Sequence, residues 1–307
     1  MSKKKIGLVF RILLGLTFIA SAALKYLSIG ATDIFLFEHK ILPWTLTQFA
    51  TRLLIAFEGG LGLMLILGIK PRLTRILTFL TLILFTIYLL LKPLLFGNTS
   101  ENCHCFGTYI QLTHFQSIAK NVVMLLMACM IGWAGAWKTR FAALIMIIIA
   151  LLTTATTFII YPPDIIFTKI YNRESTLDKE GFKAMMELDD VKALNLENGK
   201  KVLCMYSTGC KYCKQTAIRV EVMIEKYGLD RTDFATIFWG NDKNLAKFHT
   251  DTQTPELATT IVHPLIFLKA TKGKQPLIIL LDNGKIEEIY NSVTLNESKL
   301  VQFIRNN

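Results

Sequence analysis

Charge is scarce in this chain, and acidic residues are scarcest in its first half. Charged residues make up 19% of the 307 residues and hydrophobic ones 52%, whereas a soluble domain averages about 25% charged. The net charge of +11 raises the question of nucleic-acid binding. However, residues 1–160 carry 14 Lys/Arg and 4 Asp/Glu, so the excess lies in the apolar half. The composition therefore excludes an ordinary soluble enzyme, a disordered chain and a nucleic-acid partner, and it indicates a membrane protein.

Several functional signatures are also missing. The chain has no glycine-rich nucleotide-binding motif and no recognisable Ser/His/Asp arrangement. A single C-x-x-C, without a second one or a paired His, is a poor zinc site. We therefore predict no resident metal and no nucleotide cofactor.

Five apolar stretches are long enough to span a bilayer, which takes about 20 helical residues. They lie near 6–28, 46–69, 73–96, 113–135 and 141–160. We expect a membrane domain over 1–160, a linker over 161–175 and an extracytoplasmic domain over 176–307. The first stretch has some features of a cleaved signal peptide, but its length and Arg11 favour an uncleaved helix.

The loop charges predict the orientation. Cations cluster before the first stretch, between the second and third, and between the fourth and fifth: Lys3, Lys4, Lys5, Lys70, Arg72, Arg75, Lys138 and Arg140. Positive loops stay in the cytoplasm. The N-terminus is therefore expected inside, with loop 97–112 and the C-terminal domain outside.

Ionisable residues within the predicted spans need partners, because charge is costly in hydrocarbon. They are Arg11, Lys25, Arg52, Glu58 and Lys120. Glu58 lies near mid-depth, so we expect it to face the bundle interior. Its partner is expected to be a cation such as Arg11 or Arg52, and the alternative is a proton or cofactor contact.

The first cysteine pair, Cys103 and Cys105, lies in the outer loop between the third and fourth stretches. An extended chain would separate the two by about 6.6 Å, near the upper limit for a disulfide. The small ring would be strained, and strained disulfides are oxidising. Alternatives are an inert loop, or a metal site with His104 and with His39 or His114. The single cysteines Cys129 and Cys204 are expected to be buried apolar residues.

The second pair, Cys210 and Cys213, follows a strand-like run and opens a helix-like run that ends at Gly228. A thiol at a helix N-terminus has a lowered pKa. Cys210 is therefore the predicted attacking thiol and Cys213 the resolving one. Lys211 and Lys214 are expected to strengthen the effect, and Lys211 with Tyr212 to tune the potential.

The rest of the C-terminal half has an α/β pattern. We expect a strand at 234–239, a helix at 243–249, an apolar run at 265–268 and a closing helix at 298–305. A Pro276-led hairpin with an Asn283-Gly284 turn precedes that last helix.

The C-K-Y-C motif after a strand and the spacing from Pro276 to Asn283-Gly284 resemble a thioredoxin-like domain. The resemblance implies that Pro276 is the cis-proline of the substrate groove beside Tyr212, with Pro264 as the second candidate. It also implies a buried Asp six residues before the first active-site Cys. That position is Cys204 here, which puts efficient reductase proton transfer in doubt.

The membrane half resembles the DoxX-like/MauE family of redox-associated membrane proteins. The matching patterns are Arg11-x3-Gly15-x2-Phe18-x6-Lys25, Glu58-x3-Gly62-x2-Leu65-x2-Gly68 and Cys103-x-Cys105-Phe106-Gly107. The resemblance implies a four-helix core over 1–137, to which an additional span at 141–160 is attached.

These observations predict a multi-pass helical membrane bundle followed by an α/β thioredoxin-like domain, in a bacterial inner membrane. The expected function is thiol-disulfide exchange between Cys210/Cys213, periplasmic protein clients and Cys103/Cys105. Disulfide formation is favoured, with a membrane quinone as candidate electron acceptor. The alternatives are a thioredoxin-like reductase or maturation factor on a membrane scaffold, and metal handling by the Cys-His-Cys loop.

Overall fold

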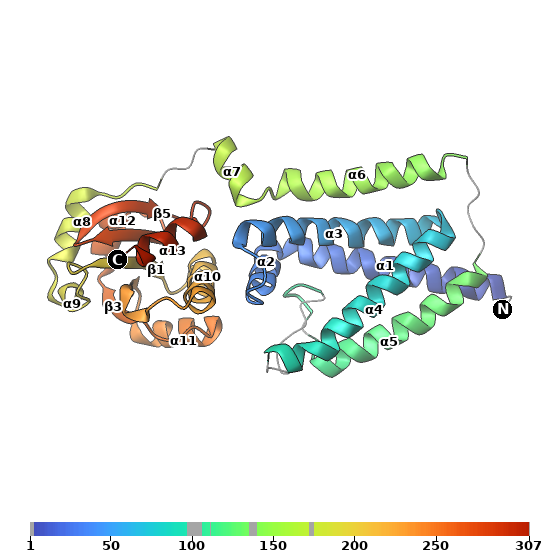
Figure 1. The fold of residues 1–307 in the computed structure, drawn as a ribbon, viewed down its shortest axis with the longest axis horizontal. Coiled ribbons are helices and arrows are strands. Elements are labelled where there is room, and N and C mark those ends of the chain that lie inside the picture. The colour runs from blue at the N-terminus through green and yellow to red at the C-terminus, as the bar shows by residue number, and fades with distance from the viewer. Residues whose placement is uncertain (1–2, 97–105, 111, 135–139, 172–174, 307) are drawn as a thin grey trace. The chain divides into compact units, whose positions relative to one another are not determined.

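A computed structural model describes residues 3–96, 106–110, 112–134, 140–171 and 175–306 (Figure 1). The chain divides into two compact units. Unit 1 comprises Met1–His39 and Leu46–Pro163, and unit 2 comprises Lys40–Thr45 and Asp164–Asn307. The short segment Lys40–Thr45 therefore belongs with the C-terminal half, which its sequence position does not suggest. The predicted linker and domain limits stay predictions.

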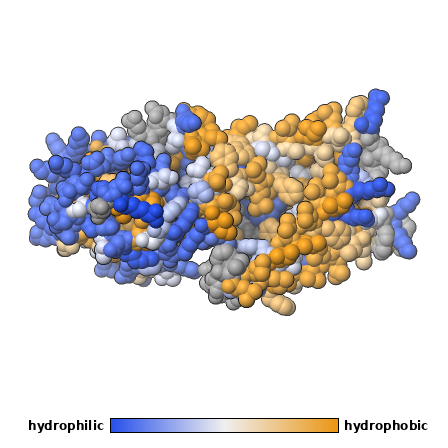
Figure 2. Space-filling model, viewed as in Figure 1, coloured by the Kyte–Doolittle hydropathy of each residue, from blue (hydrophilic) through white to orange (hydrophobic). Residues whose placement is uncertain are grey.

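Unit 1 is helical (Figure 1). Its helices are α1 (Lys3–Leu27), α2 (Ile29–Phe37), α3 (Trp44–Leu67), α4 (Pro71–Phe96), α5 (His114–Met130) and α6 (Ala142–Ile160), and a 3-10 turn, η1 (Ile131–Trp133), follows α5. Apolar residues cover much of this unit's visible surface (Figure 2). An apolar exterior is what a lipid environment favours.

Four of these helices, α1, α3, α4 and α6, are long and apolar enough to cross a membrane. The fourth predicted stretch, 113–135, is a shorter element than expected, because α5 has 17 residues before the 3-10 turn. That length is at the lower limit for a spanning helix. The nine-residue helix α2 was not predicted.

Glycines allow α1 and α3 to approach closely. A Cβ on Gly15 would lie 2.9 Å from the carbonyl oxygen of Gly62, and one on Gly62 would lie 2.8 Å from that of Gly15. Small residues commonly permit such backbone contacts between membrane helices. The two glycines of the sequence patterns therefore have a packing role.

Unit 2 contains a five-stranded sheet. Its strands are β1 (Lys200–Ser207), β2 (Phe234–Trp239), β3 (Ala258–Val262), β4 (Leu277–Asp282) and β5 (Lys285–Tyr290). The order is β3-β2-β1-β4-β5. β1 is parallel to β2 and antiparallel to β4, which forms the predicted hairpin with β5.

The helices of unit 2 are α7 (Asp164–Tyr171), α8 (Lys179–Met186), α9 (Asp189–Lys192), α10 (Lys211–Tyr227), α11 (Asp242–Thr252), α12 (Pro264–Thr271) and α13 (Glu297–Arg305), with a 3-10 turn, η2 (Arg231–Asp233). One apolar core joins β1, β2 and β4 to α8 and α12, and includes Leu203, Ile237, Phe267 and Ile279. Central strands buried on both faces read as continuous apolar runs, which made β1, β2 and β4 predictable.

The prediction for unit 2 was incomplete. Helices α8 and α9 and strand β3 were not anticipated. The apolar run at 265–268 belongs to helix α12, and the expected linker contains helix α7. β3 is short and largely half-exposed, with the sequence Ala-Thr-Thr-Ile-Val. Such an edge strand has a weak hydrophobic pattern.

Candidate functional site: a dithiol at a helix N-terminus and a polar pocket among membrane helices

Cys210 occupies the N-cap of α10, directly after β1. The helix ends as predicted at Gly228, whose φ of 60° is the left-handed conformation that favours glycine. Buried strand β1 and the capped helix therefore fix the loop that carries the dithiol.

The two thiols have different environments. Cys210 is half-buried, whereas Cys213 is fully buried. The Cys210 Sγ accepts a hydrogen bond from the Cys213 N–H at 3.3 Å, and the Cys213 Sγ accepts one from the Ser207 N–H at 3.4 Å. Of the two thiols, Cys210 is therefore the one that a second protein could reach, and its role as the attacking thiol stays a prediction.

The same asymmetry separates the thiol pKa values. A hydrogen bond from the Cys213 thiol, helped by backbone N–H groups of Cys213 and Tyr212, lowers the pKa of Cys210 to about 6. Burial raises the pKa of Cys213, and its hydrogen bond to Cys210 raises it further. At neutral pH, Cys210 is therefore mainly a thiolate and Cys213 a protonated thiol.

The neighbouring lysines do not behave as expected. Lys214 pairs with Asp251, with 2.6 Å between Nζ and Oδ2, and neither lysine is among the causes that lower the Cys210 pKa. Hydrogen bonds at the helix N-terminus, and not the charges of Lys211 and Lys214 that we predicted, thus lower the pKa of Cys210. Tyr212 is 63% exposed beside the dithiol.

Pro276 precedes β4, and the Gln275–Pro276 peptide is cis. Leu277 pairs with Met205 of β1, so Pro276 lies at the end of β1 that leads into the dithiol. Pro264 instead begins helix α12. A substrate-groove role for Pro276 and Tyr212 remains a prediction.

Cys204 is buried in β1, as predicted, and burial raises its pKa to about 12. A thiol with this pKa stays protonated at neutral pH, so it cannot replace a carboxylate as a proton acceptor. Cys129, by contrast, is exposed on α5, which corrects the expectation of burial. The prediction failed because the exposed face of a membrane helix can be as apolar as its buried face, so the residues around a cysteine look alike in both positions.

Within unit 1, Glu58 faces the bundle interior as expected, but its partner was predicted incorrectly. The Lys25 Nζ lies 2.5 Å from the Glu58 Oε1, and both side chains are about 3% exposed. Ser21 donates a hydrogen bond to the Glu58 Oε2 at 2.9 Å. Lys25, one helical turn beyond Ser21, reaches α3 at the depth of Glu58, which the two proposed arginines do not.

Arg52 has a different carboxylate partner, Asp33 of α2, at 2.6 Å. The sequence did not suggest this pair, because α2 was not anticipated. Arg11 is also buried, and its guanidinium lies where a Cβ on Gly68 would be, 2.5 Å from Arg11 Nη1. Gly68 has a φ of +68° at the end of α3, so a side chain there would be strained and would displace Arg11.

A half-open pocket surrounds the Lys25–Glu58 pair. Its volume is about 30 Å³, which is room for one or two water molecules. It is lined by Thr17, Phe18, Ser21, Lys25, Glu58, Thr81, Leu82, Phe85, Phe106, Lys120, Asn121 and Met124. The pocket thus combines aromatic and aliphatic walls with a few polar groups.

Cys103 and Cys105 lie outside the described residues, as does His104, so their pairing stays a prediction. The segment that follows them packs on α1. The Thr108 N–H donates to Ser28 Oγ at 3.4 Å, and a Cβ on Gly107 would lie 2.8 Å from the Leu24 carbonyl oxygen. Glycine at this position of the Cys-Phe-Gly motif therefore permits contact with the helix that carries Lys25.

Among the residues described, no cluster of three His, Cys, Asp or Glu side chains could hold a metal. His39, a candidate ligand, instead hydrogen-bonds to the Phe35 carbonyl and the Tyr88 hydroxyl, each at 2.7 Å. The proposed Cys-His-Cys metal site lies outside this part of the chain.

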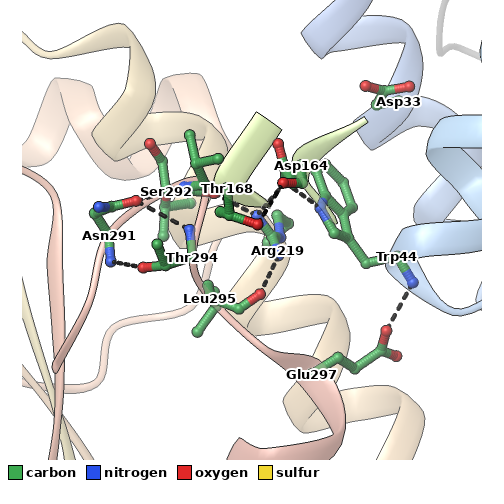
Figure 3. Close-up of polar contacts among 12 residues, drawn as sticks. Asp33, Trp44, Asp164, Thr168, Arg219, Asn291, Ser292, Thr294, Leu295 and Glu297 are labelled. Carbon is green, nitrogen blue, oxygen red and sulfur yellow. Dashed lines mark hydrogen bonds and ion pairs between the residues drawn. The ribbon is translucent and has the colours of Figure 1, made fainter. Parts of the chain in front are cut away.

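Unit 2 also contains a buried arginine that sequence reasoning missed (Figure 3). Arg219 of α10 donates to the carbonyls of Ser292 and Leu295 at 2.6 and 2.9 Å. Its guanidinium lies 3.8 Å from the Trp44 ring centroid and 3.6 Å from Asp164. Trp44 donates a hydrogen bond to Asp164 at 2.7 Å. This arginine joins segment Lys40–Thr45 to α7 and α10 within unit 2.

Comparison with known proteins identifies the helical part of the chain. Residues 3–134 match the family described as methylamine utilisation protein MauE. These residues form a MauE-family domain. The match includes the residues around the Lys25–Glu58 pocket and ends before α6, so the additional span stays a prediction.

A relative of similar length is known from Flavobacterium psychrophilum. It is described as Protein TlpB and is 23% identical, and the comparison covers 95% of this chain and 93% of the relative. The similarity thus extends over both units of this chain.

Solved structures with similarity to part of the chain include two redox proteins. One is a secreted Mycobacterium tuberculosis disulfide oxidoreductase homologous to E. coli DsbE, at 12% identity and TM-score 0.30, covering 37% of this chain and 85% of that one. The other is a thiol:disulfide interchange protein from Bacteroides sp., at 12% identity and TM-score 0.30, covering 36% and 77%. The thioredoxin-like assignment here rests on strand order and on the position of Cys210.

The protein combines membrane-spanning helices and a MauE-family domain with a thiolate-containing dithiol on a thioredoxin-like domain. It is therefore a multi-pass membrane thiol-disulfide oxidoreductase, and its substrates are protein thiols.

Proposed function

We propose that the protein forms disulfide bonds in proteins outside the cytoplasm of a bacterium and passes the electrons to a membrane quinone. The dithiol of the thioredoxin-like domain would oxidise the client, and the Cys103/Cys105 pair of the MauE-family domain would reoxidise that dithiol. The observation that carries the proposal is the Cys210 thiolate, with its pKa near 6, beside the buried Cys213 thiol.

The lowered Cys210 pKa supports the oxidising direction. A stabilised thiolate favours the reduced form of a dithiol, and a dithiol with a stable reduced form is a strong oxidant in its disulfide state. In the first step, a client thiolate attacks the Cys210–Cys213 disulfide to give a mixed disulfide. The second client thiol then releases it, so the client loses two electrons and two protons and the Cys210/Cys213 pair gains them.

In the second step, the Cys210 thiolate attacks a disulfide between Cys103 and Cys105. Cys213 then resolves the mixed disulfide, leaving Cys103 and Cys105 as thiols. Having both dithiols on one chain supports this step, since tethering gives an effective concentration in the mM range. Oxidation of Cys103/Cys105 by a quinone would complete the cycle, and the quinone would become a quinol.

The reductive direction has less support from the sequence. It would need electrons from the cytoplasm, carried across the bilayer by a cysteine pair. Cys129 is the only cysteine within a predicted span, and a single thiol is a poor relay. The loop cations support a cytoplasmic N-terminus and an outer thioredoxin-like domain.

Thiol trapping in intact cells tests the proposal. We expect Cys210/Cys213 to be at least partly oxidised in the wild type and fully reduced when Cys103 and Cys105 are replaced by Ser. The control is Cys129→Ser, which removes an exposed cysteine outside both pairs and should leave the trapping pattern unchanged.

Two results would contradict the proposal. A Cys210/Cys213 pair that rests fully reduced, and stays so after Cys103→Ser, would support a reductase. Unchanged client oxidation after loss of both loop cysteines would support a membrane domain that serves only as a scaffold.

A further inference from the structure

The buried thiol of the dithiol carries a proton that it must lose during exchange. Burial raises the pKa of Cys213 above its ordinary range, so this thiol gives up a proton whenever it attacks a mixed disulfide at Cys210. Cys204 is itself a protonated thiol at neutral pH and cannot accept that proton. A base on the buried side of the dithiol would therefore speed the reaction.

A small cavity lies in this part of unit 2, between the sheet and helices α10 and α11. Its volume is about 20 Å³, which is room for one water molecule. Tyr206 of β1, Ala217 of α10 and His249 of α11 are among the residues that line it. Cys213 lies one helical turn, about 5.4 Å, before Ala217 on the same face of α10. The Cys213 Sγ also accepts a hydrogen bond from the N–H of Ser207, the residue after Tyr206. The cavity thus begins about one helical turn from the buried thiol.

Two buried polar atoms at this cavity have no hydrogen-bond partner within the described part of the chain. They are the Tyr206 hydroxyl and the His249 Nε2. Buried polar atoms are normally hydrogen-bonded, and an internal water with two or more polar partners often satisfies them. One water in this space could accept a hydrogen bond from the Tyr206 hydroxyl and donate one to the His249 Nε2.

The contacts of the His249 ring decide which of its nitrogens is the base. The Nδ1 atom lies 3.2 Å from the Thr254 carbonyl oxygen. A carbonyl oxygen can only accept, so this bond assigns the hydrogen of the neutral ring to Nδ1 and the lone pair to Nε2. The ring packs edge-on against Phe238 and Phe248. Because His249 is half-exposed, it can pass a proton on to solvent.

The other titratable side chains that line the cavity are less suited to accept a proton. The Glu221 carboxylate of α10 accepts hydrogen bonds from both terminal nitrogens of Arg231, which stabilises its charged form. Burial raises the pKa of Tyr206 well above its ordinary value, and a negative charge on Cys204 or Cys213 raises it further. Tyr206 is therefore a neutral hydroxyl, which can relay a proton but not retain the negative charge.

We propose that Tyr206 and His249 hold one water in this cavity, and that His249 receives through it the proton that Cys213 loses. The Cys213 sulfur attacks the Cys210 sulfur of a mixed disulfide, the Cys210–Cys213 bond forms, and the client sulfur leaves with the electron pair of the broken bond. The Cys213 proton passes to the Tyr206 hydroxyl, which gives its own proton to the water, and the water gives one to the His249 Nε2. In the reverse reaction, the same groups return a proton to Cys213. Tyr206 and His249 thus act through Cys213, as positioning residues for its proton.

The test follows the reduced full chain in lipid nanodiscs with dithiobis(nitrobenzoate), an aromatic disulfide that releases a coloured thiolate. Cys103, Cys105 and Cys129 are replaced by Ser in every sample, so that the reaction reports on Cys210 and Cys213. Stopped-flow absorbance separates the release when Cys210 attacks the reagent from the second release, when Cys213 resolves the mixed disulfide. In this parent chain the rate of the second release should rise through a midpoint between about pH 5 and 8, where imidazole side chains lose their proton.

The variant His249→Asn removes the base, while its amide can still donate to the Thr254 carbonyl. We expect the second release to slow about tenfold or more at neutral pH and its midpoint in this pH range to be lost. The first release should not change. The matched control is His263→Asn, because His263 caps α12 without lining the cavity and Asn is a good N-cap. Both releases should be unchanged in this control.

A second variant keeps the test decisive if His249→Asn fails to fold. Tyr206→Phe keeps the ring that packs on Phe238 and Phe248 but removes the hydroxyl. It should slow the second release about threefold or more, again without changing the first. An unchanged second release in Tyr206→Phe would exclude the relay through the water.

Two results with His249→Asn would overturn the proposal. One is a second release with the parent rate and midpoint. The other is a slower release with an unchanged midpoint, because a merely structural effect would lower the rate alike at every pH. Neither result bears on the proposed function, since Cys213 exchanges the same proton in both directions of electron flow.

Discussion

The two units of this chain place apolar and polar side chains in opposite ways. In unit 2 the apolar residues form one core, with Phe267 fully buried, under a surface that is mainly hydrophilic (Figure 2). In unit 1 large apolar residues are exposed, such as Ile159 at 77%, while charged residues such as Glu58 are buried. The difference shows that burial of apolar side chains stabilises unit 2. Unit 1 suits a lipid environment, where pairing of buried polar groups decides which helix faces meet.

The largest expected effect contrasts the two kinds of apolar position. Phe267→Ala should destabilise unit 2 by about 3–5 kcal/mol, because it leaves a cavity in a close-packed core. Ile159→Ala, on an exposed face of α6, should change the stability of the protein in nanodiscs by less than about 0.5 kcal/mol. Thermal unfolding of both variants checks the contrast. Equal losses would mean that α6 is buried against a partner.

The next effect concerns buried charge. Arg52→Met leaves Asp33 without its guanidinium partner and should cost on the order of 3 kcal/mol. The double variant Arg52→Met/Asp33→Asn removes both charges and should recover most of that loss. Unfolding in nanodiscs compares the single with the double variant. If the double variant were less stable than Arg52→Met, the loss could not come from the unpaired Asp33 carboxylate, and this explanation would be wrong.

The smallest effect is on the protonation of Cys210. Thiolate forms as pH rises, so the alkylation rate of Cys210 by iodoacetamide should rise through a midpoint near pH 6 and then level off. Cys213→Ala removes the hydrogen bond that contributes most to the lowered pKa, and should move the midpoint upward by about one pH unit or more. Lys214→Gln is the control, since Lys214 pairs with Asp251. An upward shift in this control would restore the lysine effect that we first predicted.

The membrane and redox characters were readable because each has a strong local signal. Four of the predicted apolar stretches form helices long and apolar enough to cross a bilayer. The sequence of strand, C-x-x-C and helix also placed Cys210 at an N-cap. The Asn283-Gly284 turn likewise specified the hairpin of β4 and β5. In each case neighbouring residues alone determine the outcome.

Partner choice was harder to predict. Glu58 needed a cation, but selecting Lys25 over Arg11 or Arg52 depends on how α1 and α3 are rotated and offset. The same is true of Arg219, whose contacts with Trp44 and Asp164 join residues far apart in the chain. Neither pairing follows from a periodic pattern.

By itself, the sequence determined which segments suit a lipid environment, which cysteine caps a helix and where the sheet hairpin turns, because length, hydropathy and helix capping act over a few residues. Only the tertiary structure decided that Cys129 faces outward, that segment Lys40–Thr45 belongs with unit 2, and that Phe106 and Lys120 meet the Lys25–Glu58 pair at one pocket. Those outcomes depend on which helix faces meet, and many faces of comparable hydrophobicity were available until packing selected among them.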